Sequence, residues 1–200
     1  MRPLIALSGG LLLGLWSNLL HATADIESPR WDASYDTHFQ KYAKRYFGPH
    51  FDWRWFKAQA IAESHLRPGV TSSAGAQGIM QLLPSTFRDI QREQPHIGDL
   101  ESSKWNIAAG IYYDRQLFRK WTGLPEQERI YLTLASYNAG YARVRKAFNK
   151  VEGPARSWAL IKRYLPGETR AYVARIRQLM NEQQQGPRML RLAHLFAAAD

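Results

Sequence analysis

One glutamate at the end of an apolar segment is the residue of this chain best suited to acid–base chemistry. Glu63 closes residues 51–63, in which Phe, Trp, Ala and Ile occur almost all round the predicted helix, so most of that helix should be buried. A carboxyl group at its end is partly desolvated, which favours the protonated acid near neutral pH. Such a group can protonate a leaving group. A surface glutamate is the alternative, but the helix dipole disfavours a carboxylate at a helix C-terminus.

A turn rich in small residues follows this helix. Residues 72–78 contain Gly75 and Gly78, so the backbone there can approach a ligand or another segment closely. The turn lacks the preceding strand and the lysine of a phosphate-binding loop, and we reject that interpretation. An ordinary tight loop is the other interpretation.

Two later segments offer polar groups, although each also has an ordinary structural explanation. Residues 136–140 read Ser-Tyr-Asn-Ala-Gly and place the phenol of Tyr137 and the amide of Asn138 at a helix end. A helix cap with a packed tyrosine explains this segment well on local evidence. Residues 168–173 begin with Glu168 and include Tyr172, and a capped helix with an acid in its first turn explains them equally well.

The elements that must position these groups are helical. Apolar residues recur at helical spacing over the ranges 31–46, 51–65, 84 onward, 104–121, 126–137, 141–149 and 166–180. No run alternates convincingly as a strand, although a small ribbon within residues 70–78 stays open. We therefore predict a mostly α protein with one compact domain.

Composition limits the classes of protein that fit. The chain has 200 residues, 45% of them hydrophobic, which suits one ordinary domain with short extensions. It has no cysteine, which excludes disulfides and thiolate metal sites. Seven Trp, ten Tyr and eight Phe suffice both for a core and for a groove that binds sugars or bases. The formal charge of +10 is spread along the chain and favours polyanionic surroundings, with a solvated basic surface as the simpler explanation.

The first residues resemble an export signal. Arg2 precedes an apolar stretch at 4–20, and the small residues 22–24 form a cleavage site that leaves Asp25 as the new N-terminus. The stretch is short for a membrane span of about 20 residues, and an uncleaved anchor is the alternative. We expect a periplasmic or secreted protein, which argues against a nucleic-acid regulator.

The predicted organisation has four parts. Residues 1–24 form the signal peptide, 25–50 an N-terminal helical extension, 51–182 the catalytic domain, and 183–200 a linker and C-terminal tail.

Four segments together resemble a known family. They are Glu63-Ser64, Gly78-Ile79-Met80-Gln81, residues 136–140 and residues 168–173, and their order and spacing are similar to those of the soluble-type lytic transglycosylases. The resemblance covers roughly residues 51–180 and implies a single lysozyme-like helical domain. Each motif alone is weak, whereas four in order are specific.

The resemblance implies roles for individual residues. Glu63 would be the single catalytic acid and then the base, with Tyr137 close to it. The implied substrate-binding residues are Ser72, Gln81, Tyr137, Asn138, Glu168 and Tyr172. Two positions depart from the family pattern: Ser136 stands where Ala is usual, and Leu83 stands where many members have a Met that packs on the substrate.

The implied reaction cleaves peptidoglycan glycan strands between N-acetylmuramic acid and N-acetylglucosamine and leaves a 1,6-anhydro end. It needs no metal and no cofactor. We expect a monomer that binds glycan strands and no nucleic acid, with cell-envelope assembly or secretion machinery as a possible partner.

Two other classes of function stay open at this point. A lysozyme-like hydrolase would need a second carboxylate. The candidates, which a solvated loop explains equally well, are Asp89, Glu93, Asp99 and Glu101. A non-enzymatic wall-binding or assembly protein would keep the aromatic groove but would not need Glu63.

Overall fold

The protein is almost entirely helical in the computed structural model, which describes residues 25–153 and 156–181. The predicted mostly α class is confirmed. Within the described ranges the α-helices are α1 (Asp36–Phe47), α2 (Arg54–Ser64), α3 (Pro84–Glu93), α4 (Ser103–Arg119), α5 (Glu126–Ala139), α6 (Tyr141–Asn149), α7 (Trp158–Ile161) and α8 (Gly167–Leu179). The predicted signal peptide, its anchor alternative and the predicted tail lie outside the described residues.

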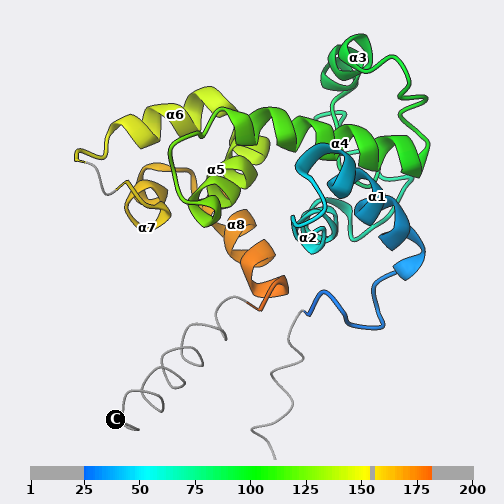
Figure 1. The fold of residues 1–200 in the computed structure, drawn as a ribbon, viewed down its shortest axis with the longest axis horizontal. Coiled ribbons are helices and arrows are strands. Elements are labelled where there is room, and N and C mark those ends of the chain that lie inside the picture. The colour runs from blue at the N-terminus through cyan, green and yellow to red at the C-terminus, as the bar shows by residue number, and fades with distance from the viewer. Residues whose placement is uncertain (1–24, 154–155, 182–200) are drawn as a thin grey trace, which may run out of the picture.

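Helix α2 is the central element of the fold. Every residue from Trp55 to Ile61 is buried, as the apolar character of the whole helix predicts. Helix α2 packs against α1 and α8, which lie beside it in Figure 1. It ends at Ser64 because His65 and Leu66 both take the left-handed backbone conformation, with φ of 57° and 61°.

Helices α4 and α5 join the two sides of the molecule. Helix α4 packs against α1, α3 and α5, and α5 packs in turn against α6, α7 and α8. In Figure 1 the long α4 runs from the side formed by α1, α2 and α3 toward the side formed by α5 to α8. The core is continuous across these helices and includes large buried side chains such as Phe39, Ile61, Leu132 and Trp121.

The segment between α2 and α3 has no strand but is well tied. Thr71 pairs with Gln77, and Gln77 pairs with Leu82, in two isolated antiparallel bridges. The small ribbon that the sequence left open within residues 70–78 is limited to these bridges. The buried Asn106 of α4 forms two hydrogen bonds with the backbone of this segment. Its Oδ1 accepts the N–H of Met80 at 2.8 Å, and its Nδ2 donates to the carbonyl oxygen of Gln77 at 3.1 Å.

The observed elements differ from the predicted ones mainly at their ends. The first helix starts at Asp36, after a 3-10 turn η1 (Ala33–Tyr35), and Trp31 lies before it with its Nε1 donating to the carbonyl of Asp25. Helix α7 and the 3-10 helix η2 (Lys162–Tyr164) have no counterpart among the elements predicted from the sequence. None of the described helices is both long and apolar enough to cross a membrane.

Candidate active site

Glu63 lies in the last turn of α2 with its carboxyl group enclosed by protein atoms. This desolvation raises the pKa of Glu63 to about 7, from an ordinary value of 4.5. The O–H of Tyr172 donates a 2.6 Å hydrogen bond to Glu63 Oε1, which favours the carboxylate and opposes the rise in pKa. Desolvation is the larger effect. The residue as a whole is partly buried and keeps some contact with solvent.

Tyr172 reaches Glu63 from a distant part of the chain. It lies in the second turn of α8, and α8 packs directly on α2. Burial raises the pKa of Tyr172 well above its ordinary value, and the charge of Glu63 raises this pKa further. Tyr172 therefore stays a neutral hydrogen-bond donor.

Tyr137 is close enough to Glu63 to be affected by its charge, but its hydroxyl group contacts the loop. Burial raises the pKa of Tyr137 well above its ordinary value, with the charges of Asp114 and Glu63 as further causes. Its O–H donates to the carbonyl oxygen of Met80 at 2.8 Å, and its ring meets Tyr113 edge-on at 5.3 Å. Tyr137 thus links α5 to the segment that contains Met80.

Ser72 and Gln81 form hydrogen bonds inside the loop between α2 and α3. Ser72 Oγ accepts the N–H of Ala76 at 3.0 Å and so closes the turn. Gln81, in the left-handed conformation at φ 47°, donates through Nε2 to the carbonyl oxygens of Gly78 and Val70 at 2.9 and 3.0 Å. Ser64, next to Glu63, donates to the carbonyl of Ile79 at 2.8 Å and ties α2 to the same loop.

Asn138 and Glu168 lie where α5 ends and α8 begins. Asn138 Oδ1 accepts the O–H of Thr169 at 2.8 Å, which joins the two helix ends. Glu168 is exposed in the first turn of α8. It precedes Tyr172 by four residues, which puts both side chains on one face of α8.

The two departures from the family pattern have different surroundings. Ser136 is buried, accepts from Trp121 Nε1 at 3.2 Å and donates to the carbonyl of Leu132 at 2.6 Å. Leu83 is 42% exposed and offers an apolar surface at the start of α3.

The four carboxylates considered for hydrolysis are all exposed, on α3 or on the loop that follows it. Glu93 Oε2 accepts from Tyr112 O–H at 2.9 Å and from Gln116 Nε2 at 2.6 Å, which ties it to α4. Asp89 pairs with Arg92 on its own helix. No group of three His, Asp or Glu residues suited to a metal occurs among the residues that the structure describes.

Sequence reasoning missed two polar residues behind Glu63. Gln59 of α2 and Asp114 of α4 are 0% and 1% exposed, and Gln59 Nε2 donates to Asp114 Oδ1 at 3.3 Å. Burial raises the pKa of Asp114 well above its ordinary value, and the charge of Glu63 adds to this rise. A signal was present: Gln59 precedes Glu63 by one helical turn, and Asp114 is an acid within an otherwise apolar helical stripe.

The sequence matches a family model and is similar to those of known proteins. The family model described as "Transglycosylase SLT domain" matches residues 38–158. Membrane-bound lytic murein transglycosylase F of Erwinia tasmaniensis is 37% identical over 132 residues, which is 64% of this chain and 25% of that protein. The namesake protein of Citrobacter koseri is 34% identical over 132 residues, 64% of this chain and 24% of that protein. This chain thus spans about a quarter of the length of the curated relatives it matches.

Solved structures agree in fold. The 70 kDa soluble lytic transglycosylase of Escherichia coli superposes with a TM-score of 0.63 at 25% identity, covering 75% of this chain and 24% of that one. An inactive Glu-to-Gln variant of lytic transglycosylase Slt from Pseudomonas aeruginosa gives a TM-score of 0.65 at 24% identity, with 75% and 24% covered. The match to the family model covers more than half of the sequence, and the chain therefore belongs to the transglycosylase SLT domain family.

Proposed function

We propose that this protein cleaves the glycan strands of peptidoglycan as a lytic transglycosylase, with Glu63 as the single acid and base. The observation that carries the proposal is the enclosed Glu63 carboxyl group, whose pKa of about 7 lies near the pH at which it would work. A group with such a pKa can both donate and accept a proton, which is what a residue with two successive roles needs.

The reaction then runs in two steps. Protonated Glu63 donates to the glycosidic oxygen, the bond from that oxygen to the anomeric carbon breaks, and N-acetylglucosamine leaves with a new hydroxyl group. The substrate's acetamido oxygen stabilises the charge at the anomeric carbon, so a second protein carboxylate is not required. Glu63, now ionised, takes the proton of the 6-hydroxyl group, whose oxygen bonds to the anomeric carbon. The product is a 1,6-anhydro sugar, and no water is consumed.

Tyr172 would orient Glu63 for this reaction. Its O–H donates to Glu63 Oε1 at 2.6 Å, which leaves Oε2 to carry the proton that is transferred. The same hydrogen bond strengthens when Glu63 becomes a carboxylate, which prepares the second step.

The other substrate-binding roles are part of the same proposal. Tyr137, Gln81 and Ser72 support the loop beside Glu63 through the hydrogen bonds described above. In this role they shape the wall of the glycan groove, and Leu83 adds apolar surface for a sugar ring. Asn138 and Glu168 would act at the edge of the groove, where α5 and α8 meet.

Hydrolysis of the lysozyme type has less support. The exposed Glu93 and Asp89 are already bound to α4 and to Arg92. Asp114 is 1% exposed and lies behind Glu63 in the core, so it cannot attack a sugar. A binding protein without activity would have no use for a glutamate whose pKa is raised toward neutrality.

The test is mass spectrometry of the fragments released from purified peptidoglycan sacculi by the protein and by Glu63→Gln. Anhydro-muramyl fragments that disappear with Glu63→Gln support the proposal. Reducing, hydrated ends would replace it with hydrolysis. Release of fragments by Glu63→Gln at a comparable rate would show that another residue is the acid.

The setting of the activity is proposed on the same basis. The curated relatives are named as membrane-bound murein transglycosylases, which supports peptidoglycan as the substrate and the cell envelope as the location. A partner in envelope assembly or secretion and the monomeric state stay predictions from the sequence.

A further inference from the structure

A second layer of polar residues lies beneath the candidate active site. Gln59 of α2 precedes Glu63 by one helical turn, and Thr133 of α5 precedes Tyr137 by one turn. Asp114 of α4 adjoins Tyr113, whose ring contacts Tyr137. Helices α2, α4 and α5, which carry Glu63, Tyr113 and Tyr137, thus also carry a set of buried polar residues. We call this set the inner polar layer: Gln59, Asp114 and Thr133. Its members are 0%, 1% and 5% exposed.

Each member of the inner polar layer has an atom without a hydrogen-bond partner. Gln59 Nε2 bonds to Asp114 Oδ1, but Gln59 Oε1, Asp114 Oδ2 and Thr133 Oγ1 have no partner among the described residues. Buried polar groups are almost always hydrogen-bonded, because the loss of water is costly for them. Three such atoms in one place indicate a shared ligand.

The three residues line one small cavity. Its volume is about 20 Å³, and the rest of its wall is mostly aromatic and aliphatic, including Phe47, Phe56 and Phe118. A cavity of this size has room for one water molecule when several polar groups face it. The three unpaired atoms belong to three of the residues that line this cavity.

We propose that Gln59, Asp114 and Thr133 bind one internal water molecule, and that Asp114, in its neutral form, is a positioning residue for Glu63. A neutral Asp114 accepts from Gln59 through Oδ1 and donates its O–H to the water through Oδ2. The water donates to Gln59 Oε1, which can only accept, and shares its remaining hydrogen bond with Thr133. Every unpaired atom of the layer then has a partner.

The charges around Asp114 agree with a neutral acid. Its charged neighbour on α2 is Glu63, whose negative charge opposes ionisation of Asp114. Two cations lie near the cavity wall, Arg115 of α4 over the ring of Phe47 and Arg129 of α5 over the ring of Phe118. Both stack on the aromatic wall. Lys57, also on α2, is paired with Asp36 of α1 at 2.7 Å.

This arrangement has a consequence for the reaction. A second carboxylate near Glu63 would repel its negative charge and so disfavour the loss of its proton. A neutral Asp114 causes no such repulsion. The hydrogen bond from Gln59 to Asp114 also fixes the turn of α2 that precedes Glu63 against α4. The positioning part of the inference rests on the proposed function of Glu63, whereas the water site does not.

The water site is tested first, in a high-resolution crystal structure of the full chain. We expect density for one water molecule within hydrogen-bond distance of Asp114 Oδ2, Gln59 Oε1 and Thr133 Oγ1, also with Asp114→Asn. Thr133→Val removes one partner at nearly constant volume and should lower or abolish that density. A dry cavity in the unchanged protein would overturn the water site, whatever the outcome for activity.

The positioning role is tested by kinetics of glycan cleavage. Asp114→Asn keeps a donor and an acceptor without charge, and we expect kcat within about twofold and an unchanged pH profile. Asp114→Leu removes the hydrogen bond that fixes Gln59, one turn before Glu63, against α4. We expect it to lower kcat by about tenfold or more with little change in KM, and to move the pH profile, because the position of Glu63 is then less well fixed. Should Asp114→Leu not fold, Gln59→Leu serves in its place.

Opposite results would overturn the positioning role. Loss of activity with Asp114→Asn in a folded protein would mean that the charged form is needed. Unchanged kcat and pH profile with both leucine variants would mean that the layer only fills space. Absence of cleavage by the unchanged protein would instead count against the proposed function, and the crystallographic test of the water site would still stand.

Discussion

Two opposite effects set the protonation of Glu63. Enclosure in protein raises its pKa, because the carboxylate loses its hydration, and the hydrogen bond from Tyr172 lowers it, because the bond stabilises the charge. The effect of desolvation on the pKa is larger than that of the hydrogen bond, and the pKa of Glu63 rises to about 7. The acid form that the proposed first step needs and the carboxylate that the proposed second step needs are thus close in free energy at neutral pH.

The first prediction separates these two effects. Tyr172→Phe removes the hydrogen bond but keeps the ring, so the pKa of Glu63 should rise above about 7. If Glu63 acts as the acid, the alkaline limb of kcat/KM on soluble glycan strands moves to higher pH. The rate at low pH should also fall, since Glu63 loses its orientation. Tyr164→Phe, at a 42% exposed tyrosine, is the control and should leave the profile unchanged. An alkaline limb that stays in place with Tyr172→Phe would contradict this account.

The second prediction concerns stability. The pKa of Glu63 is higher in the folded protein, about 7, than its ordinary value of 4.5, so folding favours the protonated form. Its contribution to stability is complete below about pH 4.5 and is lost as pH rises through about 7. Glu63→Gln cannot ionise and escapes this loss.

Urea unfolding of the two proteins measures this difference. The free energy of unfolding of Glu63→Gln should increase relative to that of the unchanged protein as pH rises, by at most about 3 kcal/mol near pH 8. The two free energies of unfolding should differ least below about pH 4.5, where Glu63 is neutral in both the folded and the unfolded state. A difference that does not depend on pH would mean that the enclosure of Glu63 is too small to shift its pKa.

The sequence indicated Glu63 and Tyr172 as candidate site residues but did not indicate the hydrogen bond between them. An apolar helix with one terminal acid is a local pattern, readable from residues 51–63. The hydrogen bond from Tyr172 joins residues 109 positions apart and depends on how α8 packs against α2, which local patterns do not specify. Gln59 and Asp114 were missed for a related reason: a buried polar pair across two helices has no signature in either helix alone.

At the scale of elements, helical periodicity predicted the long helices and failed for short ones. Helices α1, α4, α5 and α8 each bury a stripe of apolar residues, and that stripe is visible in the sequence. Helix α7 has four residues, too few for a periodic pattern, and it exists because Trp158 and Ile161 pack into the core. The backbone of residues 72–78 was predicted to be able to approach another segment closely, but the hydrogen bonds of Gln77 and Met80 to Asn106 could not be foreseen, since Asn106 comes from α4.

The third prediction tests how this loop is held. Gly78 has φ +78°, and a Cβ there would lie 2.3 Å from Nδ2 of Asn106. Gly78→Ala must therefore displace the side chain that holds the N–H of Met80 and the carbonyl of Gln77. We expect a loss of about 2–4 kcal/mol in unfolding free energy, from backbone strain and broken buried hydrogen bonds together. Cleavage should fall as well, since Met80 contacts Tyr137.

Gly75→Ala is the matched control in the same loop. Gly75 has nearly the same φ, +79°, but nothing lies within 4 Å of its Cβ position. Its substitution should cost only the left-handed strain, about 1 kcal/mol, and leave cleavage nearly unchanged. Urea unfolding and a cleavage assay of both variants measure the difference. Equal losses at the two positions would show that strain, and not the contact with Asn106, determines the cost.

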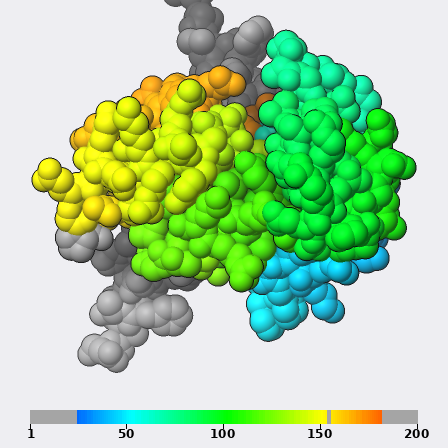
Figure 2. Space-filling view, turned by 90° about the horizontal axis from the view of Figure 1, so that it is seen from above, coloured from blue at the N-terminus to red at the C-terminus, as the bar shows by residue number. Residues whose placement is uncertain are grey.

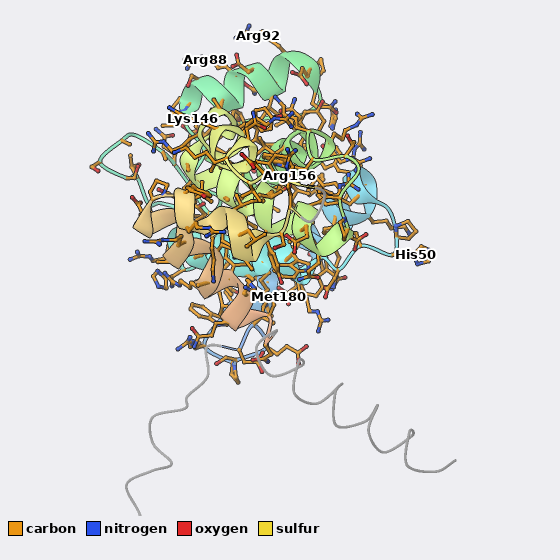
Figure 3. All side chains as sticks on the ribbon, turned by 90° about the vertical axis from the view of Figure 1, so that its left-hand side faces the viewer. His50, Arg88, Arg92, Lys146, Arg156 and Met180 are labelled. Atoms are coloured by element: carbon orange, nitrogen blue, oxygen red, sulfur yellow. The ribbon has the colours of Figure 1, made fainter. Side chains whose placement is uncertain are left out.

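At the scale of the whole molecule, the expectation that the charge is spread evenly along the sequence is wrong, because net positive charge is concentrated in about the last quarter of the described chain. Residues 141–181 contain ten Lys or Arg and two Asp or Glu, against 27 and 17 in the full sequence. They form α6, α7 and α8, whose yellow and orange surface in Figure 2 lies across from the blue-green surface of the α3 region. On α3 itself Arg88 and Arg92 point outward, as Figure 3 shows, but Arg92 pairs with Asp89.

This asymmetry predicts how the protein binds an anionic wall. Exposed cations on one side raise the local concentration of a polyanion and lose this effect as salt screens them over about 10 Å at 0.1 M. Glu63→Gln, which the proposed mechanism expects not to cleave the glycan, should therefore bind isolated sacculi several-fold more weakly at high salt than at low salt. The pair Arg143→Glu and Lys146→Glu, exposed on α6, should weaken binding at low salt more than Arg88→Glu and Arg92→Glu on α3. Because both pairs change the net charge by the same amount, equal losses would show that overall charge, and not the surface of α6, attracts the wall. Binding that does not change with salt would exclude an electrostatic cause of the attraction to the wall.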